Sequence, residues 1–161
     1  HGTTLGCLRA FDRLLDQGRS FENVLDLGCG TAVLAMAAAR MSLNSVIASD
    51  IDPVAVEVAV VNVLANDLEG RVNCVESIGF DGPALAQAAP FDLIFANILK
   101  GPLVDLAPDM AMHLAPGGIA ILSGLLVEQA DDIVAVYNAQ GIDLMEREDL
   151  GEWTALTLIH K

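Results

Sequence analysis

The sequence predicts an α/β protein with a seven-stranded, mostly parallel sheet, helices on both of its faces and an antiparallel last strand. Two observations support this class. Five short apolar runs alternate with helix-like segments, as parallel strands and their crossover helices do. After Gly141, two strand-like runs follow one another with only a few residues around Gly151 between them. That spacing leaves no room for a crossover helix, so these two runs should form a hairpin.

The parallel strands are expected in apolar runs bounded by turn residues, a pattern typical of buried strands. They are "NVLDL" (23–27), "SVIASD" (45–50), "RVNCVE" (71–76), "FDLIFA" (91–96) and "GIAILSG" (118–124). The hairpin strands should be "IDLMERE" (142–148) and "WTALTLIH" (153–160). No internal repeat, low-complexity tract or linker interrupts the alternation, so residues 1–161 should form one domain.

The first helix is expected to begin at "HGTT", where two threonines precede apolar residues at helical spacing. Threonine side chains can accept hydrogen bonds from the free N–H groups of a first helical turn, so Thr3 and Thr4 should be N-caps. The buried stripe of this helix should consist of Leu5, Leu8, Phe11 and Leu15.

Residues 53–66 can be interpreted in two ways, because valines alternate there as they would in a strand. Asp52 followed by Pro53 is typical of a helix start, and the run is long for a strand, so we predict a helix. Another helix should begin at Pro102, with "APGG" (115–118) as the turn into the next strand. Its apolar stripe would be Leu103, Leu106, Met110 and Leu114. Gly141 should end a helix that begins near Val127.

Composition narrows the function classes. No apolar run approaches the roughly 20 residues of a bilayer crossing, and no basic-then-apolar leader is visible, so we expect no membrane contact and a cytoplasmic location. The formal net charge is −14 without a basic cluster, which argues against direct nucleic-acid binding. An acidic surface attracts a basic protein or amine substrate, although it also simply favours solubility. The three cysteines and three histidines form no disulfide or metal motif.

The first strand continues into "LDLGCGTAVLAMAA", a glycine turn followed by a helix of small residues. Gly28 and Gly30 would let the backbone approach a ligand closely, next to the free N–H groups of that helix. A GxGxxG dinucleotide fingerprint needs glycine or alanine at the place of Val33. The turn therefore favours a ligand other than a dinucleotide.

Three polar residues lie at expected strand ends. Asp26 would repel a pyrophosphate but could order the glycine turn and attract a cationic ligand group, while also capping backbone N–H groups. Asp50, twenty residues after Gly30, is placed to accept hydrogen bonds from two ribose hydroxyls, although aspartate also favours strand ends for local reasons. Asn97 offers donors and an acceptor at the same edge, and capping of the following turn explains it equally well.

As a set, "LDLGCGTA", "SDIDP", "FDLIFANIL" and "LAPGG" resemble the class I S-adenosylmethionine-dependent methyltransferases over nearly the whole chain. "HGTTLGCL", "ANILKGPL", "LSGLL" and "EWTALTLIHK" resemble, within that class, the family that methylates large-subunit ribosomal protein L11. The resemblance implies a Rossmann-like fold, S-adenosylmethionine as cofactor and a separate upstream domain that recognises the substrate. It implies cofactor contacts at Thr4, Thr3, Gly28, Asp50 and Asn97.

Two local departures bear on chemistry. Ala32 replaces the third glycine that the family's loop usually has, so cofactor affinity is open while binding itself is expected to survive. "ANIL" lacks the proline-rich motif of methyltransferases that act on planar nitrogens, so the resemblance favours an aliphatic amine, a lysine side chain or an α-amine. Asn97 is the candidate for orienting that amine, and Cys29, without a paired histidine, is expected to be a small residue under the turn rather than a nucleophile.

The leading prediction is therefore a protein-lysine N-methyltransferase domain that acts on a basic ribosomal protein and is itself monomeric. A methyltransferase for another protein or a small molecule is the alternative of the same class. Val33 and Asp26 argue against an NAD-dependent oxidoreductase. Ala32 is the only residue that favours a catalytically inactive nucleotide-binding module.

Overall fold

A computed structural model describes all residues, 1–161, and contains one seven-stranded sheet in the order β3-β2-β1-β4-β5-β7-β6. The first five strands are parallel, and β7 is antiparallel to both of its neighbours. The strands are β1 (Val24–Leu27), β2 (Val46–Asp50), β3 (Val72–Glu76), β4 (Phe91–Asn97), β5 (Leu114–Leu126), β6 (Ile142–Leu150) and β7 (Trp153–His160). The predicted sheet, with one reversed strand in a terminal hairpin, is confirmed.

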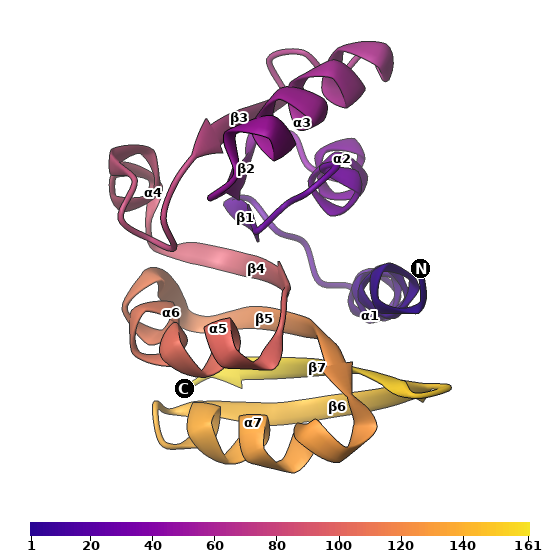
Figure 1. The fold of residues 1–161 in the computed structure, drawn as a ribbon, viewed down its shortest axis with the longest axis vertical. Coiled ribbons are helices and arrows are strands. Elements are labelled where there is room, and N and C mark those ends of the chain that lie inside the picture. Colours follow the sequence, from indigo (N-terminus) through magenta and orange to yellow (C-terminus); the bar gives the residue numbers. More distant parts are fainter.

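The helices form two layers around the sheet (Figure 1). They are α1 (Gly2–Asp16), α2 (Val33–Arg40), α3 (Pro53–Ala65), α4 (Pro83–Ala88), α5 (Lys100–Asp105), α6 (Ala107–His113) and α7 (Ala130–Asn138), with a 3₁₀ turn at Val127–Gln129. One core joins α1, α2 and α3 to one face of the sheet, and a second core joins α4, α5, α6 and α7 to the other. None of these helices combines the length and the apolar character that a membrane crossing needs.

Strand order reverses between β1 and β4, because the chain adds β2 and β3 on one side of β1 before it returns to add β4 on the other. In open α/β sheets, ligands bind in the crevice at the carboxyl ends of the strands at this reversal. The glycine turn after β1, Asp50 at the end of β2 and Asn97 at the end of β4 all lie there. The topology thus brings together residues that the sequence separates by tens of positions.

The start of α1 differs from the prediction. His1 is the N-cap, and its Nδ1 accepts a hydrogen bond from the backbone N–H of Thr3 at 3.3 Å. Thr3 and Thr4 lie inside the first turn, so their prediction as N-caps was wrong. The predicted stripe was also partly wrong, since Leu5 is 49% exposed. The buried face consists instead of Thr3, Gly6, Cys7, Ala10, Phe11 and Leu14, with Leu8 and Leu15 at its margin.

The segment after β4 forms two short helices rather than one that begins at Pro102. The break falls at Leu106, which is the C-cap of α5 and the N-cap of α6, and Pro108 is the second residue of α6. Residues 115–118, expected as a turn, lie within β5 as an insertion: Leu114 pairs with Phe91, and pairing resumes between Ile119 and Leu93. The helix at 53–66 and the glycine after the 127–138 segment are confirmed, with Asp52 Oδ1 capping Val54 N at 2.9 Å.

Candidate functional site

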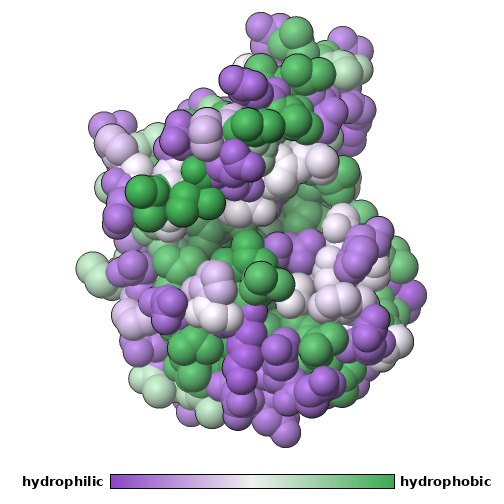
Figure 2. Space-filling model, in the orientation of Figure 1, coloured by the Kyte–Doolittle hydropathy of each residue, from purple (hydrophilic) through white to green (hydrophobic).

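A cavity of about 380 Å³ opens at the carboxyl ends of β1 to β4, and this volume suits a small-molecule ligand. Figure 2 shows hydrophobic residues around a recess between α3 and the α5 region. The cavity is lined by Leu27, Gly28, Ser49, Asp50, Ile51, Ser77, Gly79, Ile98, Leu99, Pro102 and Leu106. Its walls are mostly apolar and its polar groups are few, as in sites that hold a flat ring and fix its orientation by a few hydrogen bonds.

The glycine turn forms one wall through left-handed backbone conformations. Gly28 has φ 69° and Gly30 has φ 52°, which glycine adopts without steric cost. A Cβ at Gly28 would lie 2.6 Å from Cγ2 of Ile98, so this position needs glycine for space as well. Ala32 takes the same kind of conformation, with φ 67° and ψ 21°, and its methyl group is buried. The alanine therefore adopts the geometry that a glycine would supply.

Asp50 connects the glycine turn to α3. Its Oδ2 accepts a hydrogen bond from Gly30 N–H at 3.0 Å, and its Oδ1 accepts one from Asp52 N–H at 3.0 Å. Each carboxylate oxygen keeps acceptor capacity beyond these bonds, and the side chain lines the cavity. The group is thus oriented by backbone and able to accept from a pair of hydroxyls.

Asp26 lies beneath the turn rather than in the cavity. It is 2% exposed, and its Oδ2 accepts a hydrogen bond from Ala35 N–H at 3.0 Å in the first turn of α2. Burial raises the pKa of this carboxyl to about 7; the Ala35 bond opposes the rise and the nearby Asp50 charge adds to it. Its contact with the loop helix supports an ordering role, and its effect on a ligand stays a prediction.

Asn97 faces α1 and a second, smaller cavity. Its Nδ2 donates to Thr4 Oγ1 at 3.4 Å, whereas its Oδ1 accepts no hydrogen bond within the chain. The second cavity, of about 280 Å³, is lined by His1, Thr3, Asn97, Ile98, Leu99, Gly124 and Trp153. Ile98 and Leu99 line both cavities and so stand between them. The structure therefore places Thr3, Thr4 and Asn97 together. Ile98 and Leu99 separate this group from Gly28 and Asp50, which line the first cavity.

Thr3 is held by hydrogen bonds with two residues, Ser123 and His1. Its carbonyl accepts a hydrogen bond from Ser123 Oγ at 2.9 Å, and its own N–H binds His1. The His1 ring lies 5.4 Å from the Trp153 ring, centroid to centroid, so the start of α1 rests on the first residue of β7. These contacts hold the "HGTT" segment over the end of β5.

Several lining residues were missed by the sequence reasoning. Ser77 and Gly79 follow β3, and Ser77 Oγ donates to Gly79 O at 2.8 Å, which shapes that loop. The sequence did offer a signal for these two residues: they follow the third parallel strand, whose carboxyl end lies at the same sheet edge as those of the other parallel strands. Ser49 was missed because only its burial marks it: the side chain is 1% exposed, and its hydroxyl has no hydrogen-bond partner.

Cys29 is buried within the turn, and burial raises the pKa of its thiol, with Asp26 and Asp50 raising it further. A protonated, buried thiol is a poor nucleophile. No group of three or more histidine, cysteine or acidic side chains lies close enough to hold a metal ion. The polar chemistry of this edge therefore rests on Asp50, Asn97, the hydroxyls and the backbone of the glycine turn.

Comparison with known proteins decides the family. The profile described as "Ribosomal protein L11 methyltransferase (PrmA)" matches residues 1–161. The chain belongs to the ribosomal protein L11 methyltransferase family. It is 48% identical over 158 residues to the L11 methyltransferase of Bradyrhizobium diazoefficiens and 47% identical over 156 residues to that of Chelativorans sp.. These alignments cover 98% and 97% of this chain but 53% of each relative, so the chain spans about half the length of these relatives.

Solved structures agree with this membership. The ribosomal protein L11 methylase of Lactobacillus delbrueckii subsp. bulgaricus superposes with a TM-score of 0.82 at 29% identity, covering 100% of this chain and 80% of that one. A methyltransferase from Pyrococcus furiosus gives a TM-score of 0.73 at 23% identity, covering 95% and 81%. At 23% identity, the similarity to the Pyrococcus furiosus protein shows only that the fold is shared. The class I methyltransferase fold predicted from the sequence is confirmed.

Proposed function

We propose that this chain is the catalytic domain of an S-adenosylmethionine-dependent methyltransferase that transfers methyl groups to amino groups of ribosomal protein L11. Membership of the L11 methyltransferase family supports the reaction class. The observation that carries the proposal is the placement of Asp50: a carboxylate held by Gly30 N–H and Asp52 N–H at the mouth of an apolar cavity. That arrangement suits a nucleoside, whose base fills the cavity and whose ribose hydroxyls reach the acid.

The residues present fit S-adenosylmethionine. Gly28 and Gly30 take conformations that leave room for a ligand against the backbone, and Asp50 keeps free acceptor sites for the ribose. Thr3, Thr4 and Asn97 are the residues that would hold the methionine end, since they line or adjoin the second cavity beyond Ile98. When bound, the cofactor supplies an electrophilic methyl group on a sulfonium.

The chain's own contribution is to align the accepting amine and to favour its neutral form. A lysine amine with a pKa near 10.4 needs about 4 to 5 kcal/mol to reach the free base at pH 7. Packing of the amine against Ile98, Leu99 and Trp153 would desolvate it and lower that pKa, as would a neighbouring cation. Asn97 Oδ1, which has no partner within the chain, accepts a hydrogen bond from the amine and aims its lone pair.

Charge supports a basic substrate. The chain carries 22 acidic residues against 8 lysines and arginines, so its surface attracts a cationic protein and repels a phosphate backbone. We assign lysine side chains as the acceptors, with the α-amine as a second acceptor, and a monomeric catalytic domain that works in the cytoplasm. Because the relatives are about twice as long, we expect recognition of the ribosomal protein to depend on a separate domain.

Transfer of a labelled methyl group to purified ribosomal protein L11 tests the assignment. The full-length protein should label L11, with the label on lysine or the amino terminus after peptide mapping, and residues 1–161 alone should label it poorly. Equal activity of the two would contradict the separate recognition domain. Labelling of other proteins or small molecules but not of L11 would favour the alternative of a methyltransferase with a different substrate.

Asn97→Ala tests the orienting role. Loss of the Oδ1 acceptor should lower turnover about tenfold with L11 as substrate, because the amine is no longer aligned. Asn73→Ala is the matched control, since Asn73 is exposed on β3 and away from both cavities. If Asn97→Ala left turnover and cofactor affinity at the levels of Asn73→Ala, the role assigned to Asn97 would be wrong.

A further inference from the structure

Ser49 is a polar side chain without a partner in the interior of the protein. It is 1% exposed, and its hydroxyl makes no hydrogen bond within the chain. Buried hydroxyl groups are nearly always paired, because an unpaired one loses its bonds to water without replacement. An orphaned hydroxyl in a native fold therefore calls for a partner that arrives from outside.

The sheet itself provides no such partner. Ser49 lies beside Leu27 of β1 and Val75 of β3 in register, and both neighbours are apolar. The backbone carbonyl of Ser49 is already engaged, accepting from Cys29 N–H at 2.8 Å. In a strand, unlike a helix, no carbonyl of a preceding turn lies within reach of the hydroxyl. Ser49 is, however, one of the residues that line the 380 Å³ cavity.

The position of Ser49 separates it from the acid that follows. Successive side chains of a strand point to opposite faces, so Ser49 and Asp50 leave β2 in different directions. Ser49 shares its face of the sheet with Leu27, its register partner on β1, and both residues line the cavity, whose walls are mostly apolar. A hydroxyl there meets the part of a ligand that is flat and apolar but carries polar atoms on its edge.

We propose that the Ser49 hydroxyl makes a hydrogen bond to the edge of the purine base of the bound nucleoside, and so adds a base contact to the ribose contact of Asp50. This inference rests on the proposed function, because it requires that the cavity hold the nucleoside. The hydroxyl can donate to a ring nitrogen or accept from the exocyclic amine. A net hydrogen bond between neutral groups corresponds to about a two- to tenfold change in affinity.

The first test compares Ser49→Ala with the unchanged protein by calorimetric titration of S-adenosylhomocysteine. The variant should bind about two- to tenfold more weakly while its melting temperature stays the same or rises, because no bond within the chain is lost. Cys74→Ala is the matched control: it removes a small polar group from the adjacent strand, paired with Ala48 and outside the cavity, and should leave the affinity unchanged.

The second test locates the bond. Four analogues of S-adenosylhomocysteine, three with one purine ring nitrogen replaced by C–H and one without the amino group of the base, are titrated into both proteins. One analogue should bind the unchanged protein about two- to tenfold more weakly yet show little of that loss in Ser49→Ala, since the two changes remove the same bond.

The outcomes separate the two claims. If the unchanged protein does not bind S-adenosylhomocysteine, the proposed function fails and the assignment of Ser49 fails with it. If it binds and Ser49→Ala binds equally well, only the assignment of Ser49 is overturned. If Ser49→Ala binds more weakly but every analogue loses the same affinity in both proteins, the hydroxyl does not contact the base, and the proposal is again overturned.

Discussion

Asp26 shows how a single residue couples the site to pH. The carboxyl is buried under α2, and this burial raises its pKa to about 7. The charge of Asp50 adds to the rise. Burial raises the pKa of the nearby Cys7 and Cys29 thiols, and the charge of Asp26 raises it further. The protonated acid is therefore the form that the fold favours, and ionisation of Asp26 works against folding.

The first prediction concerns the pH dependence of stability. Below pH 4 the acid is protonated in both the folded and the unfolded chain, and between pH 4 and about 7 only the unfolded chain loses the proton. Stability of the unchanged protein should fall across this window by up to a few kcal/mol relative to Asp26→Asn, and the difference should level off above pH 7. Urea unfolding at a series of pH values measures it.

Asp12→Asn, at an exposed position on α1, is the control and should show no such trend. A difference between Asp26→Asn and the unchanged protein that is flat from pH 4 to pH 7 would show that Asp26 is ionised with an ordinary pKa. Asparagine keeps an oxygen that accepts from Ala35 N–H, so the comparison isolates the charge.

Ala32 and Gly28 share a left-handed backbone but should respond differently to substitution. Ala32→Gly removes about 1 to 2 kcal/mol of backbone strain, but it also removes a buried methyl group worth about 0.8 kcal/mol and adds backbone entropy to the unfolded chain. We expect a net change in unfolding free energy below about 1 kcal/mol.

Gly28→Ala should be strongly destabilising, because it adds strain at φ 69° and a contact of 2.6 Å with Ile98. Thermal unfolding of Ala32→Gly and Gly28→Ala measures the two stability changes side by side. Equal losses in both variants would contradict the distinction between Ala32, whose side chain the fold accommodates, and Gly28, where a Cβ has no room.

How far residues could be predicted from the sequence depends on the kind of signal. The sequence order of Gly28, Gly30, Asp50 and Asn97 at or just after strand ends is recognisable, and the structure brings them to one edge. Ser49 could not be found that way, because its distinguishing property is the absence of a partner among residues distant in sequence. The left-handed conformation of Ala32 was likewise visible only once the backbone was known.

At the scale of elements, α1 carries Thr3 and Thr4 and is held on the sheet by charge as well as by its apolar face. Arg9 Nε lies 2.6 Å from Glu148 Oε1, Arg13 forms an ion pair with Glu148 as well, and Arg13 Nε lies 3.1 Å from Glu146 Oε1. Glu148 is the common partner and is only 18% exposed, so these pairs are less screened than surface pairs. β6 is thereby connected to the helix above the site.

Glu148→Gln should lower the unfolding free energy by about 1 kcal/mol and weaken binding of S-adenosylhomocysteine, because α1 is held less firmly. Denaturation at low and at high salt measures the first effect, which should shrink as salt screens the pairs. Glu152→Gln, at an exposed residue without an ion pair, should change neither quantity. A Glu148→Gln effect that is independent of salt would argue against the ionic contribution.

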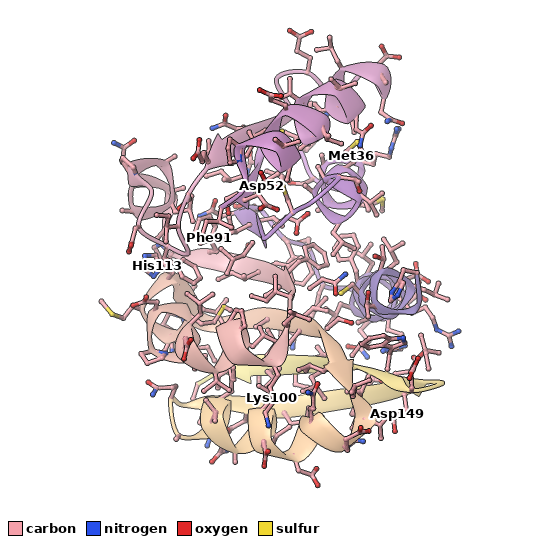
Figure 3. The ribbon with its side chains drawn as sticks, in the orientation of Figure 1. Met36, Asp52, Phe91, Lys100, His113 and Asp149 are labelled. Atoms are coloured by element: carbon pink, nitrogen blue, oxygen red, sulfur yellow. The ribbon has the colours of Figure 1, made fainter.

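Element boundaries were harder to predict than element types. Every predicted strand is present, because apolar runs between turn residues depend on local sequence. The α5–α6 break falls just before Pro108, which lacks the backbone N–H that a continuous helix needs. Long-range contacts fix the position of α5: Tyr137 of α7 donates its hydroxyl to Leu103 O at 2.8 Å, and Lys100 Nζ lies 2.8 Å from Asp132 Oδ2. Figure 3 shows Lys100 over the α5–α7 contact. Such contacts join segments about thirty residues apart and leave no periodic pattern.

For the molecule as a whole, the net charge is −14, and α3 carries a face of exposed apolar side chains. Only Ala59 and Val63 of this helix are buried, whereas Val54, Val58, Val61 and Leu64 are exposed and form one face. Figure 2 shows hydrophobic residues near the top of the molecule, where α3 lies. Exposed apolar faces of this kind promote association in concentrated solution.

Val61→Gln should therefore leave the unfolding free energy within about 0.5 kcal/mol of the unchanged protein, because the side chain is 65% exposed. It should also reduce concentration-dependent light scattering. Val63→Gln, two residues away but 4% exposed, should instead cost about 2 kcal/mol or more, because it buries an unpaired amide. Similar stability losses in both variants would contradict the orientation of α3.

The central claim is that the cavity at the carboxyl ends of β1 to β4 binds a sulfur nucleoside through Asp50. Calorimetric titration of residues 1–161 with S-adenosylmethionine, S-adenosylhomocysteine and NAD tests it most directly, with Asp50→Ala measured alongside. The account predicts saturable binding of both sulfur nucleosides, none of NAD, and at least about tenfold weaker binding by Asp50→Ala, since two hydrogen bonds to a charged acceptor are lost. Saturable binding of NAD with no response to either sulfur nucleoside would contradict it.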